Sequence, residues 1–199
     1  KNMKKKNYKF TILGCGSSGG VPRIGNDWGK CNPSNPKNSR LRCSLLVQKQ
    51  DKLGTTNILI DSGPDMRQQL LKANVSKLDA VVYTHFHADH VNGIDDLRMV
   101  AINVKKIIPI WADHKTEKKL KRSFNYIFNT TEGSKYPPIL NLNIIKSFFK
   151  ISGLGGDVNF IPFKVNHGEI NALGFKIENI AYIPDVLDIP QKTFSLLKN

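Results

Sequence analysis

The sequence predicts a mixed α/β domain in which strands and helices form layers. Strand-like and helix-like segments alternate in the first part of the chain, and a run of strand-like segments follows, which is typical of layered α/β architectures. The 199 residues suffice for one well-buried core, and no internal repeat is apparent. We therefore expect residues 1–199 to form a single domain.

The first part of the chain predicts five strands, one helix and two loops. Apolar and β-branched runs indicate strands at 8–13, 44–49, 57–61, 78–83 and 107–111. Pro109 weakens the last of these. Residues 64–73 have helical spacing, and Pro64 suits a helix start. The glycine-rich segment 14–20 and the polar segment 21–43 are expected to be loops; long loops of this kind are usually functional or mobile.

The second part of the chain predicts more strands than helices. Basic and apolar residues alternate at helical spacing over 113–128, which indicates a helix, and residues 129–138 form a turn-rich loop. Four strand-like runs follow at 139–145, 158–165, 174–178 and 180–183. Residues 190–197 are expected to form a last helix.

The composition is that of an ordinary globular protein, with 40% hydrophobic residues. No apolar run is long enough to span a bilayer, and the basic segment 1–9 is not followed by the apolar part of a signal peptide. We therefore expect a cytoplasmic protein without a membrane partner. Three cysteines, an odd number, argue against a disulfide framework. Free thiols are the simpler interpretation, and a structural metal on Cys31 and Cys43 is the alternative.

The net charge of +14 is the main compositional bias. A strongly basic chain suits a polyanionic partner such as RNA. The alternative is codon bias, because the sequence is rich in Lys, Asn and Ile and most lysines are scattered. Charge alone therefore leaves nucleic-acid binding open.

Three of the five histidines lie within six residues, in the segment THFHADH that follows the buried strand 78–83. His85 and His87 are two residues apart, so on an extended backbone both side chains point to the same side. Imidazole is a common ligand of zinc and similar ions, and the C-terminal edge of strands is where α/β sheets build their sites. The segment therefore predicts a metal site.

Asp89 and His90 follow where the chain is expected to turn into a helix, so their side chains point in another direction. Two pairs of ligands whose side chains point in two directions suit two metal ions. Two ions about 3.5–4 Å apart are the common arrangement in hydrolytic enzymes. Two other interpretations are solvated histidines on a surface loop and a structural zinc site, although structural sites prefer cysteine.

The motif and its surroundings resemble the metallo-β-lactamase superfamily. THFHADH resembles the H-x-H-x-D-H signature of that superfamily, and further matches occur on both sides in the family's order: TILGCGSSGGVPRIG, LIDSGPDMRQQLL, PFKVNHGE and IAYIPDV. The opening GCGSSGGVPR and the loop to RCSLLV resemble a subgroup that contains phosphodiesterases of phosphoribosyl cyclic phosphate. The resemblance implies an αβ/βα sandwich that lacks its last strand and helix in this chain.

The resemblance also implies the ligands, residue by residue. A first metal would be held by His85, His87 and His167. A second would be held by Asp89 and His90, with Asp185 bridging the two ions. The family pattern has one more histidine after the bridging Asp, and no histidine follows His167 in this sequence. The chain is therefore expected to be a fragment, a truncated remnant, or a protein in which water or a partner chain completes the site.

Two residues near these ligands receive other roles. Asp61 is expected to orient a ligand histidine or the backbone, and His114 is expected to lie on the surface, on or near a helix. The loop 14–20 is a candidate wall of the pocket.

The resemblance implies a metal-dependent hydrolase that cleaves phosphodiesters with a metal-activated hydroxide, and Asp89 is the candidate to orient the nucleophile and handle its proton. The cofactors would be two divalent ions, zinc first, with manganese or iron accepted by the same ligands. The partners considered are a small anionic substrate, nucleic acid and a second copy in a homodimer. Alternatives are an endonuclease that trims tRNA 3′ ends, a thioester or lactone hydrolase, and a non-catalytic remnant.

Overall fold

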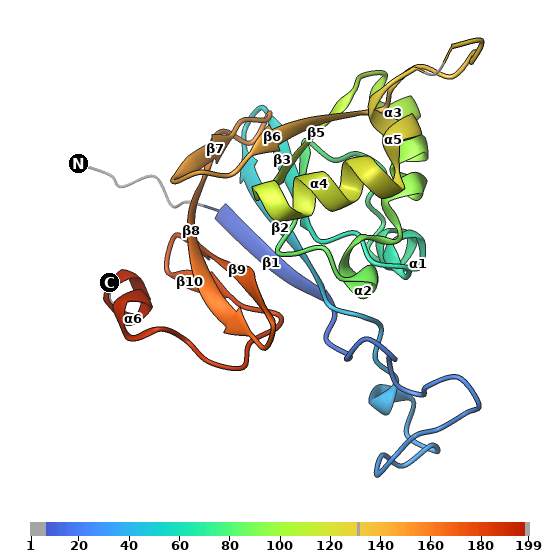
Figure 1. The fold of residues 1–199 in the computed structure, drawn as a ribbon, viewed down its shortest axis with the longest axis vertical. Coiled ribbons are helices and arrows are strands. Elements are labelled where there is room, and N and C mark those ends of the chain that lie inside the picture. The colour runs from blue at the N-terminus through green and yellow to red at the C-terminus, as the bar shows by residue number, and fades with distance from the viewer. Residues whose placement is uncertain (1–6, 131, 198–199) are drawn as a thin grey trace.

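The computed structural model describes residues 7–130 and 132–197, which form two β-sheets packed face to face (Figure 1). The first sheet has the strand order β1-β2-β3-β4-β5-β6. Strands β1 to β3 pair antiparallel, and β3 to β6 pair parallel. The strands are β1 (Asn7–Gly14), β2 (Ser44–Asp51), β3 (Gly54–Ile60), β4 (Ala80–Val82), β5 (Ile108–Ala112) and β6 (Leu140–Ile144).

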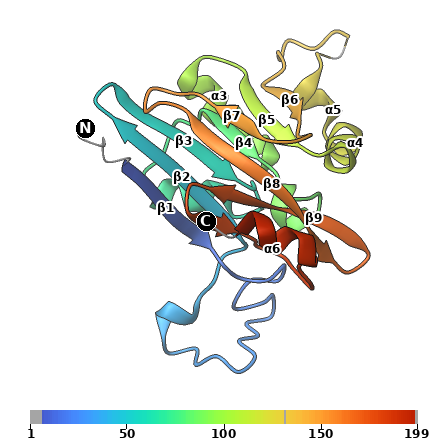
Figure 2. The ribbon, with the colours of Figure 1, turned by 90° about the vertical axis from the view of Figure 1, so that its left-hand side faces the viewer.

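The second sheet has four strands in the order β10-β9-β8-β7, and all its pairs are antiparallel (Figure 2). The strands are β7 (Phe149–Ile151), β8 (Val158–His167), β9 (Ile170–Ile177) and β10 (Ile180–Tyr182). Strands β8 and β9 are joined by a two-residue turn in which Gly168 has a φ of 69°. Glycine adopts this left-handed conformation without a steric penalty, so the turn is tight and fixes the hairpin register.

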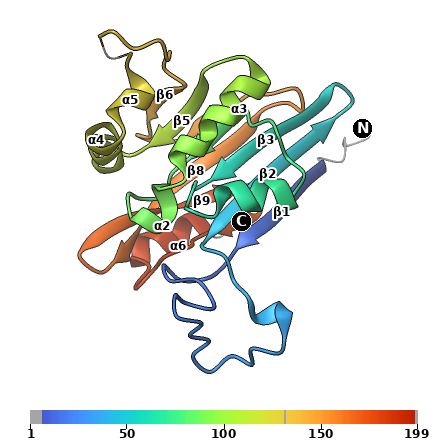
Figure 3. The ribbon, with the colours of Figure 1, turned by 90° about the vertical axis from the view of Figure 1, so that its right-hand side faces the viewer.

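Helices cover the face of the first sheet that points away from the second sheet (Figure 3). They are α1 (Met66–Lys72), α2 (Ala88–Val91), α3 (Leu97–Val104), α4 (His114–Ser123) and α5 (Asn125–Phe128), with the 3₁₀ turn η2 (Ile94–Asp96). The 3₁₀ turn η1 (Pro36–Asn38) lies in the projecting loop between β1 and β2 and has no buried residue (Figure 1). Helix α6 (Gln191–Leu197) packs on β8 of the second sheet. The order helix, sheet, sheet, helix is the αβ/βα sandwich that the family resemblance implies.

Each pair of layers encloses its own apolar core. One lies between the helices and the first sheet and contains Leu46, Tyr83 and Leu97. The second lies between the sheets, where Phe149 and Phe160 stack with ring centroids 4.9 Å apart. A small third cluster joins Phe163 to the segment that contains α6. The first two cores clamp β3 and β4 from both sides, so the residues at their C-terminal ends have a rigid support.

Most predicted elements are present, and three expectations need correction. The single helix predicted over 113–128 is wrong: Phe124 has φ −132° and ψ 37°, which ends α4 and separates it from α5. Strand β9 begins at Ile170 rather than at residue 174. Helix α3 and strand β7 were not predicted. Pro109 fits within β5 because the pairing with β4 begins only at Ile110, so its missing N–H costs no hydrogen bond to that neighbour.

The three cysteines are free thiols, as predicted. Within residues 7–130 and 132–197, no group of potential metal ligands includes a cysteine. In the same residues, no helix has the length and apolar character that crossing a bilayer requires. The cytoplasmic location stays a prediction.

Candidate metal centre

The C-terminal ends of the neighbouring parallel strands β3 and β4 meet at one edge of the first sheet, and the chain carries polar residues there. Asp61 follows β3, and Thr84 and His85 follow β4 closely. His87 is the residue that precedes α2, whose short turn carries Asp89 and His90. His167 ends β8, and Asp185 lies shortly after β10. All six predicted ligands therefore reach the same edge from three segments of the chain.

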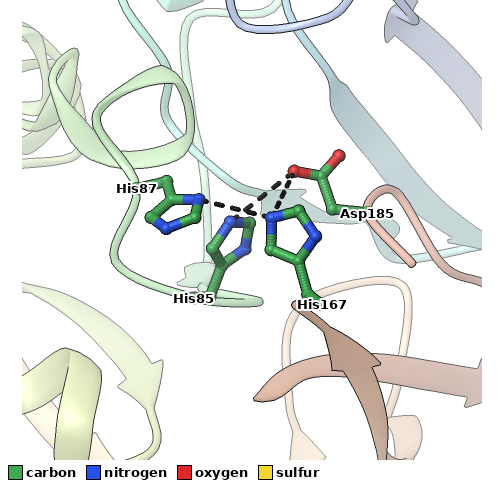
Figure 4. A group of neighbouring side chains, drawn as sticks. All are labelled: His85, His87, His167 and Asp185. Atoms are coloured by element: carbon green, nitrogen blue, oxygen red, sulfur yellow. Dashed lines mark hydrogen bonds and ion pairs between the residues drawn. The ribbon is translucent and has the colours of Figure 1, made fainter. Parts of the chain in front are cut away.

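Four of these side chains form a first group, in which His85, His87, His167 and Asp185 converge (Figure 4). One potential ligand atom from each lies within 4.8 Å of all the others. His167 Nε2 is 3.3 Å from His87 Nδ1 and 3.4 Å from Asp185 Oδ2. Asp185 Oδ2 is also 3.6 Å from His85 Nε2. Three imidazoles and one carboxylate at such distances can bind one cation in four-coordinate geometry.

Asp89, His90 and Asp185 form a second group. His90 Nε2 lies 3.2 Å from Asp185 Oδ2 and 3.4 Å from Asp89 Oδ2. Asp185 thus belongs to both groups and occupies the place that the resemblance assigns to a bridging ligand. Within the part of the chain that the structure describes, this second group has three side chains where the first has four.

A buried carboxylate fixes the second group. Asp61 is fully buried; its Oδ2 lies 2.8 Å from His90 Nδ1 and accepts a 2.7 Å hydrogen bond from the Thr84 hydroxyl. Its Oδ1 accepts a 2.8 Å bond from the Thr84 backbone N–H. With Nδ1 held by Asp61, the His90 ring presents Nε2 to the site. This arrangement matches the orienting role expected for Asp61.

Glycine at two positions lets α2 approach the loop after β3. A Cβ on Gly63 would lie 2.1 Å from the Asp89 carbonyl oxygen, and a Cβ on Gly93 would lie 2.1 Å from the Gly63 carbonyl oxygen. The Ser62 N–H donates to the His90 carbonyl at 2.9 Å across the same contact. Any larger residue would displace α2, so the two glycines set the position of Asp89 and His90.

His85 has an unpartnered nitrogen that fits a cation. Its Nδ1 is 3.0 Å from the Thr84 hydroxyl, whereas its buried Nε2 has no hydrogen-bond partner in the described residues. Burial lowers the pKa of His85 to about 4, so the ring is neutral at physiological pH. A neutral imidazole with a free, buried nitrogen that faces two other histidines and a carboxylate is the donor arrangement that a divalent cation requires.

The pKa of His90 is shifted in the opposite direction from that of His85. Burial by itself would lower its pKa, but the attraction of Asp61 and the hydrogen bonds to Asp185 and Asp89 raise the pKa to about 12. The hydrogen bonds from His90 in turn hold the pKa of Asp89 and of Asp185 below the ordinary value. The second group is therefore an anionic environment that favours positive charge.

Four of the six candidate ligands, His87, Asp89, His167 and Asp185, line a cleft of about 390 Å³, and His85 and His90 lie buried. Ser17 and Ser18 of the glycine-rich loop also line it, together with Pro184 and Val186. The loop thus forms a wall of the site, as the sequence predicts. Arg42 donates from Nε to the Ser18 carbonyl at 3.2 Å and pairs with Asp65 at 2.9 Å, which ties the loop to the start of α1.

Comparison with known proteins identifies the family. The sequence model of the beta-lactamase superfamily domain matches residues 56–199. The chain belongs to this superfamily. The match contains all six candidate ligands, and the layered fold agrees with it.

Three proteins that are similar to this chain differ in how much of their own length it spans. The crystal structure of a diphosphatase from the PhnP family has 35% sequence identity and a TM-score of 0.81, and the match covers 96% of this chain and 70% of that one. An octanoyltransferase of Porphyromonas gingivalis is 33% identical over 192 residues, which is 94% of this chain but only 37% of that enzyme. A ribonuclease Z of Clostridium kluyveri is 29% identical over 82 residues, or 40% of this chain and 26% of the enzyme.

The superfamily site contains residues that sequence reasoning missed. Thr84 was read only as part of the motif, yet its hydroxyl contacts both Asp61 and His85. The signal was available, because Asp61 and Thr84 each follow a strand of the parallel pair β3 and β4. Ser17 and Ser18 gave no signal beyond their glycine-rich loop. His114 lies at the exposed start of α4, as predicted, and takes no part in the site.

Proposed function

We propose that this chain is the catalytic domain of a metal-dependent hydrolase that cleaves phosphodiesters. The observation that carries the proposal is the pair of ligand groups that share Asp185 on the floor of an open cleft. A two-cation site of this kind suits the attack of water on a phosphoryl group. The similarity to a diphosphatase over 96% of this chain supports phosphorus chemistry in particular.

The proposed cofactors are two divalent cations, with zinc first and manganese or iron as alternatives. Histidine nitrogens and carboxylate oxygens make up both groups, a donor set that suits these ions. His85, His87 and His167 would hold one cation, and Asp89 and His90 the other, with Asp185 between them. When bound, the cations would supply Lewis-acid chemistry: they lower the pKa of water and offset the charge that builds on the phosphoryl oxygens.

The protein's own residues would orient the reaction. Asp89 is partly exposed to the cleft, and the hydrogen bond from His90 lowers the pKa of its carboxyl group, so it is an ionised acceptor for the proton of an attacking water. Ser17 and Ser18 line the same cleft, where their hydroxyls would hydrogen-bond to phosphoryl oxygens. The substrate would contact Asp89 and both serines.

Turnover of bis(p-nitrophenyl) phosphate by the metal-loaded chain tests the proposal. We expect measurable release of p-nitrophenol and its loss in the His87→Ala and Asp89→Asn variants. Asp95→Asn is the matched control: Asp95 is an exposed residue of η2 that pairs with Arg98, and its replacement should leave turnover unchanged. A chain that binds metal but cleaves neither this ester nor any other phosphodiester would contradict the proposal.

A second candidate function is an endonuclease that acts on tRNA. The 82-residue similarity to a ribonuclease Z and the net charge of +14 favour it. Binding should then weaken steeply with salt, because lysines would release counterions from the RNA. Cleavage of a precursor tRNA near its 3′ end, measured on a gel at rising salt, would move the assignment to this candidate.

A further inference from the structure

Arg42 is adjacent to two segments that line the metal cleft, although it does not line the cleft itself. Its Cδ atom lies 3.9 Å from the position that a Cβ atom on Gly20 would take, at the end of the glycine-rich loop. Its Cβ atom lies 3.9 Å from the position of a Cβ atom on Gly63, the residue against which the Asp89 carbonyl packs. The same side chain therefore contacts the glycine-rich loop and the segment that positions Asp89.

Asp65 and Gln69 fix Arg42 relative to α1. Arg42 Nη1 donates to Asp65 Oδ1 at 2.9 Å, and the Arg42 backbone N–H donates to Asp65 Oδ2 at 2.8 Å. The Arg42 carbonyl oxygen accepts a 2.9 Å hydrogen bond from the Gln69 side chain. Only 29% of the Arg42 side chain and 13% of the Asp65 side chain are exposed, so water screens this pair less than a surface ion pair.

The segment around Arg42 holds the glycine-rich loop on both sides of Ser17. Arg42 Nε donates to the Ser18 carbonyl at 3.2 Å. The backbone N–H and the carbonyl oxygen of Gly16 form hydrogen bonds of 2.8 and 3.4 Å with the two chain neighbours of Arg42. Ser17 lies between these two anchored residues, and it lines the cleft together with Ser18. The position of both serines therefore depends on residues 41–43.

We infer that Arg42 is a positioning residue for substrate binding. The inference rests on the proposed function, in which the hydroxyls of Ser17 and Ser18 hydrogen-bond to phosphoryl oxygens. Because Arg42 does not line the cleft, it would act through the position of these serines. The planar guanidinium group is required, because a lysine is a point charge and does not present donors to the Asp65 carboxylate and the Ser18 carbonyl in one fixed geometry.

The separation of KM and kcat in Arg42→Gln tests the inference, with the zinc-loaded chain and bis(p-nitrophenyl) phosphate. We expect KM to rise about tenfold, because a displaced hydroxyl loses its hydrogen bond to a charged phosphoryl group. The value of kcat should stay within about twofold, because glutamine keeps the Cβ atom that packs near Gly63 and so leaves Asp89 in place. A variant that merely folded less well would have a lower apparent kcat and an unchanged KM, and this result would overturn the inference.

Arg42→Lys keeps the positive charge beside Asp65 and separates charge from geometry. We expect its KM to rise by a similar factor of about ten, because the contact with the Ser18 carbonyl is lost. Full recovery of KM in Arg42→Lys would show that charge alone is sufficient, and the inference would be overturned.

Arg98→Gln is the matched control. Arg98 has the same exposed side-chain fraction as Arg42, 29%, and also pairs with an aspartate, but it lies on α3 and does not line the cleft. Its replacement should leave KM unchanged. An equal rise of KM in this control would show a general effect of lost positive charge and would overturn the inference.

A double-mutant cycle shows whether Arg42 acts through the serines. Ser17→Ala/Ser18→Ala removes both hydroxyls and keeps the backbone carbonyl that Arg42 contacts. We expect this variant to have a raised KM, and the addition of Arg42→Gln to raise KM by less than about twofold more, because the groups that Arg42 positions are already absent. Additive losses would overturn the inference.

The reactivity of Cys43 measures the position of the loop without any turnover, so it separates this inference from the proposed function. The Cys43 thiol contacts the loop, and burial raises its pKa to about 11, so it should react slowly with 5,5′-dithiobis(2-nitrobenzoate). Cys15 and Cys31 are exposed and should react fast. If the intact chain cleaves no phosphodiester, we still expect one slow thiol in the intact chain and in Arg98→Gln, and none in Arg42→Gln. A slow thiol retained in Arg42→Gln would overturn the inference.

Discussion

His85 and His90 both lie in the interior at the same edge of the first sheet, yet they differ in their affinity for protons. His85 faces the neutral hydroxyl of Thr84, and burial lowers its pKa to about 4. His90 faces the carboxylate of Asp61, and although burial opposes it, the surrounding carboxylates raise the pKa of His90 to about 12. The same residue type in two neighbouring positions thus differs in charge because of its hydrogen-bond partner.

Because His85 and His90 differ in protonation, the two ligand groups would bind a cation in different ways. The first group contains the neutral imidazole of His85, so a cation displaces no proton from that ring. The second group holds a proton on His90, and a cation must replace it. We therefore expect binding of a cation at the second group to depend on pH more steeply than binding at the first.

The largest expected effect comes from breaking the first group. His167→Ala removes one of its four side chains and leaves the second group intact. We expect metal affinity at the first group and turnover to fall by more than the roughly 10–100-fold that loss of an outer partner costs. Competition with a chelator of known affinity measures the metal affinity. Retention of tight binding at both groups would contradict the assignment of His167.

Asp61→Asn removes the charge that supports His90 but keeps the size of the side chain. We expect affinity at the second group to fall about 10–100-fold, the usual cost of losing the partner of a ligand histidine. The first group should be less affected, because His85 is oriented by Thr84. Equal losses at both groups in the chelator assay would show that Asp61 acts on the fold rather than on His90.

The pH dependence of metal binding tests the difference in protonation between His85 and His90. The pKa of His90 in the folded chain is raised above the ordinary value of 6.5 to about 12, so its proton stabilises the metal-free fold below about pH 6.5 and this contribution is lost as pH rises toward 12. Because the cation replaces this proton, affinity at the second group should increase by up to about tenfold per pH unit above pH 6.5. Titrations at pH 6.5, 7.5 and 8.5 measure the slope, and a flat profile at the second group would count against a proton on His90.

The smallest expected effect is that of Thr84→Val, which replaces the hydroxyl by a methyl group of similar shape. It removes the hydrogen bonds to His85 and Asp61, each worth about 0.5–1.5 kcal/mol. We expect affinity at the first group to fall by roughly 2–10-fold, which is less than the effect of Asp61→Asn at the second. If Thr84→Val lost more metal affinity than Asp61→Asn, Thr84 would be the more important of the two residues that orient ligand histidines, contrary to this expectation.

The elements that sequence could predict are those with a local signal. The strand that ends at Val82 and the two histidines after it are specified by an apolar run and a motif, and the structure places both as expected. The helix break at Phe124 depends on packing, since residues 113–128 keep an apparent helical period across it. Helix α3 contains the β-branched residues Val100, Ile102 and Val104. Because β-branched residues lower helix propensity, this segment carried no clear helical signal in the sequence.

The residues of the candidate site likewise differ in whether the sequence could predict them. The six candidate ligands could be named because a resemblance specified their order, and the structure brings them into two groups that share Asp185. Contacts between distant segments gave no sequence signal. The approach of Gly63 to the Asp89 carbonyl and the wall formed by Ser17 follow from how the loops fold over the sheet edge.

The amount of divalent metal that the purified chain retains tests the central claim most directly. The chain should be loaded with zinc, freed of weakly bound ions on a desalting column at pH 8.5, and analysed for metal and protein in the same sample. Two ions per chain, falling to one in Asp61→Asn, is the expected result for two groups that share Asp185. A metal content near zero would contradict a cation site at His85, His87 and His167 and would leave a non-catalytic remnant of the superfamily as the correct description.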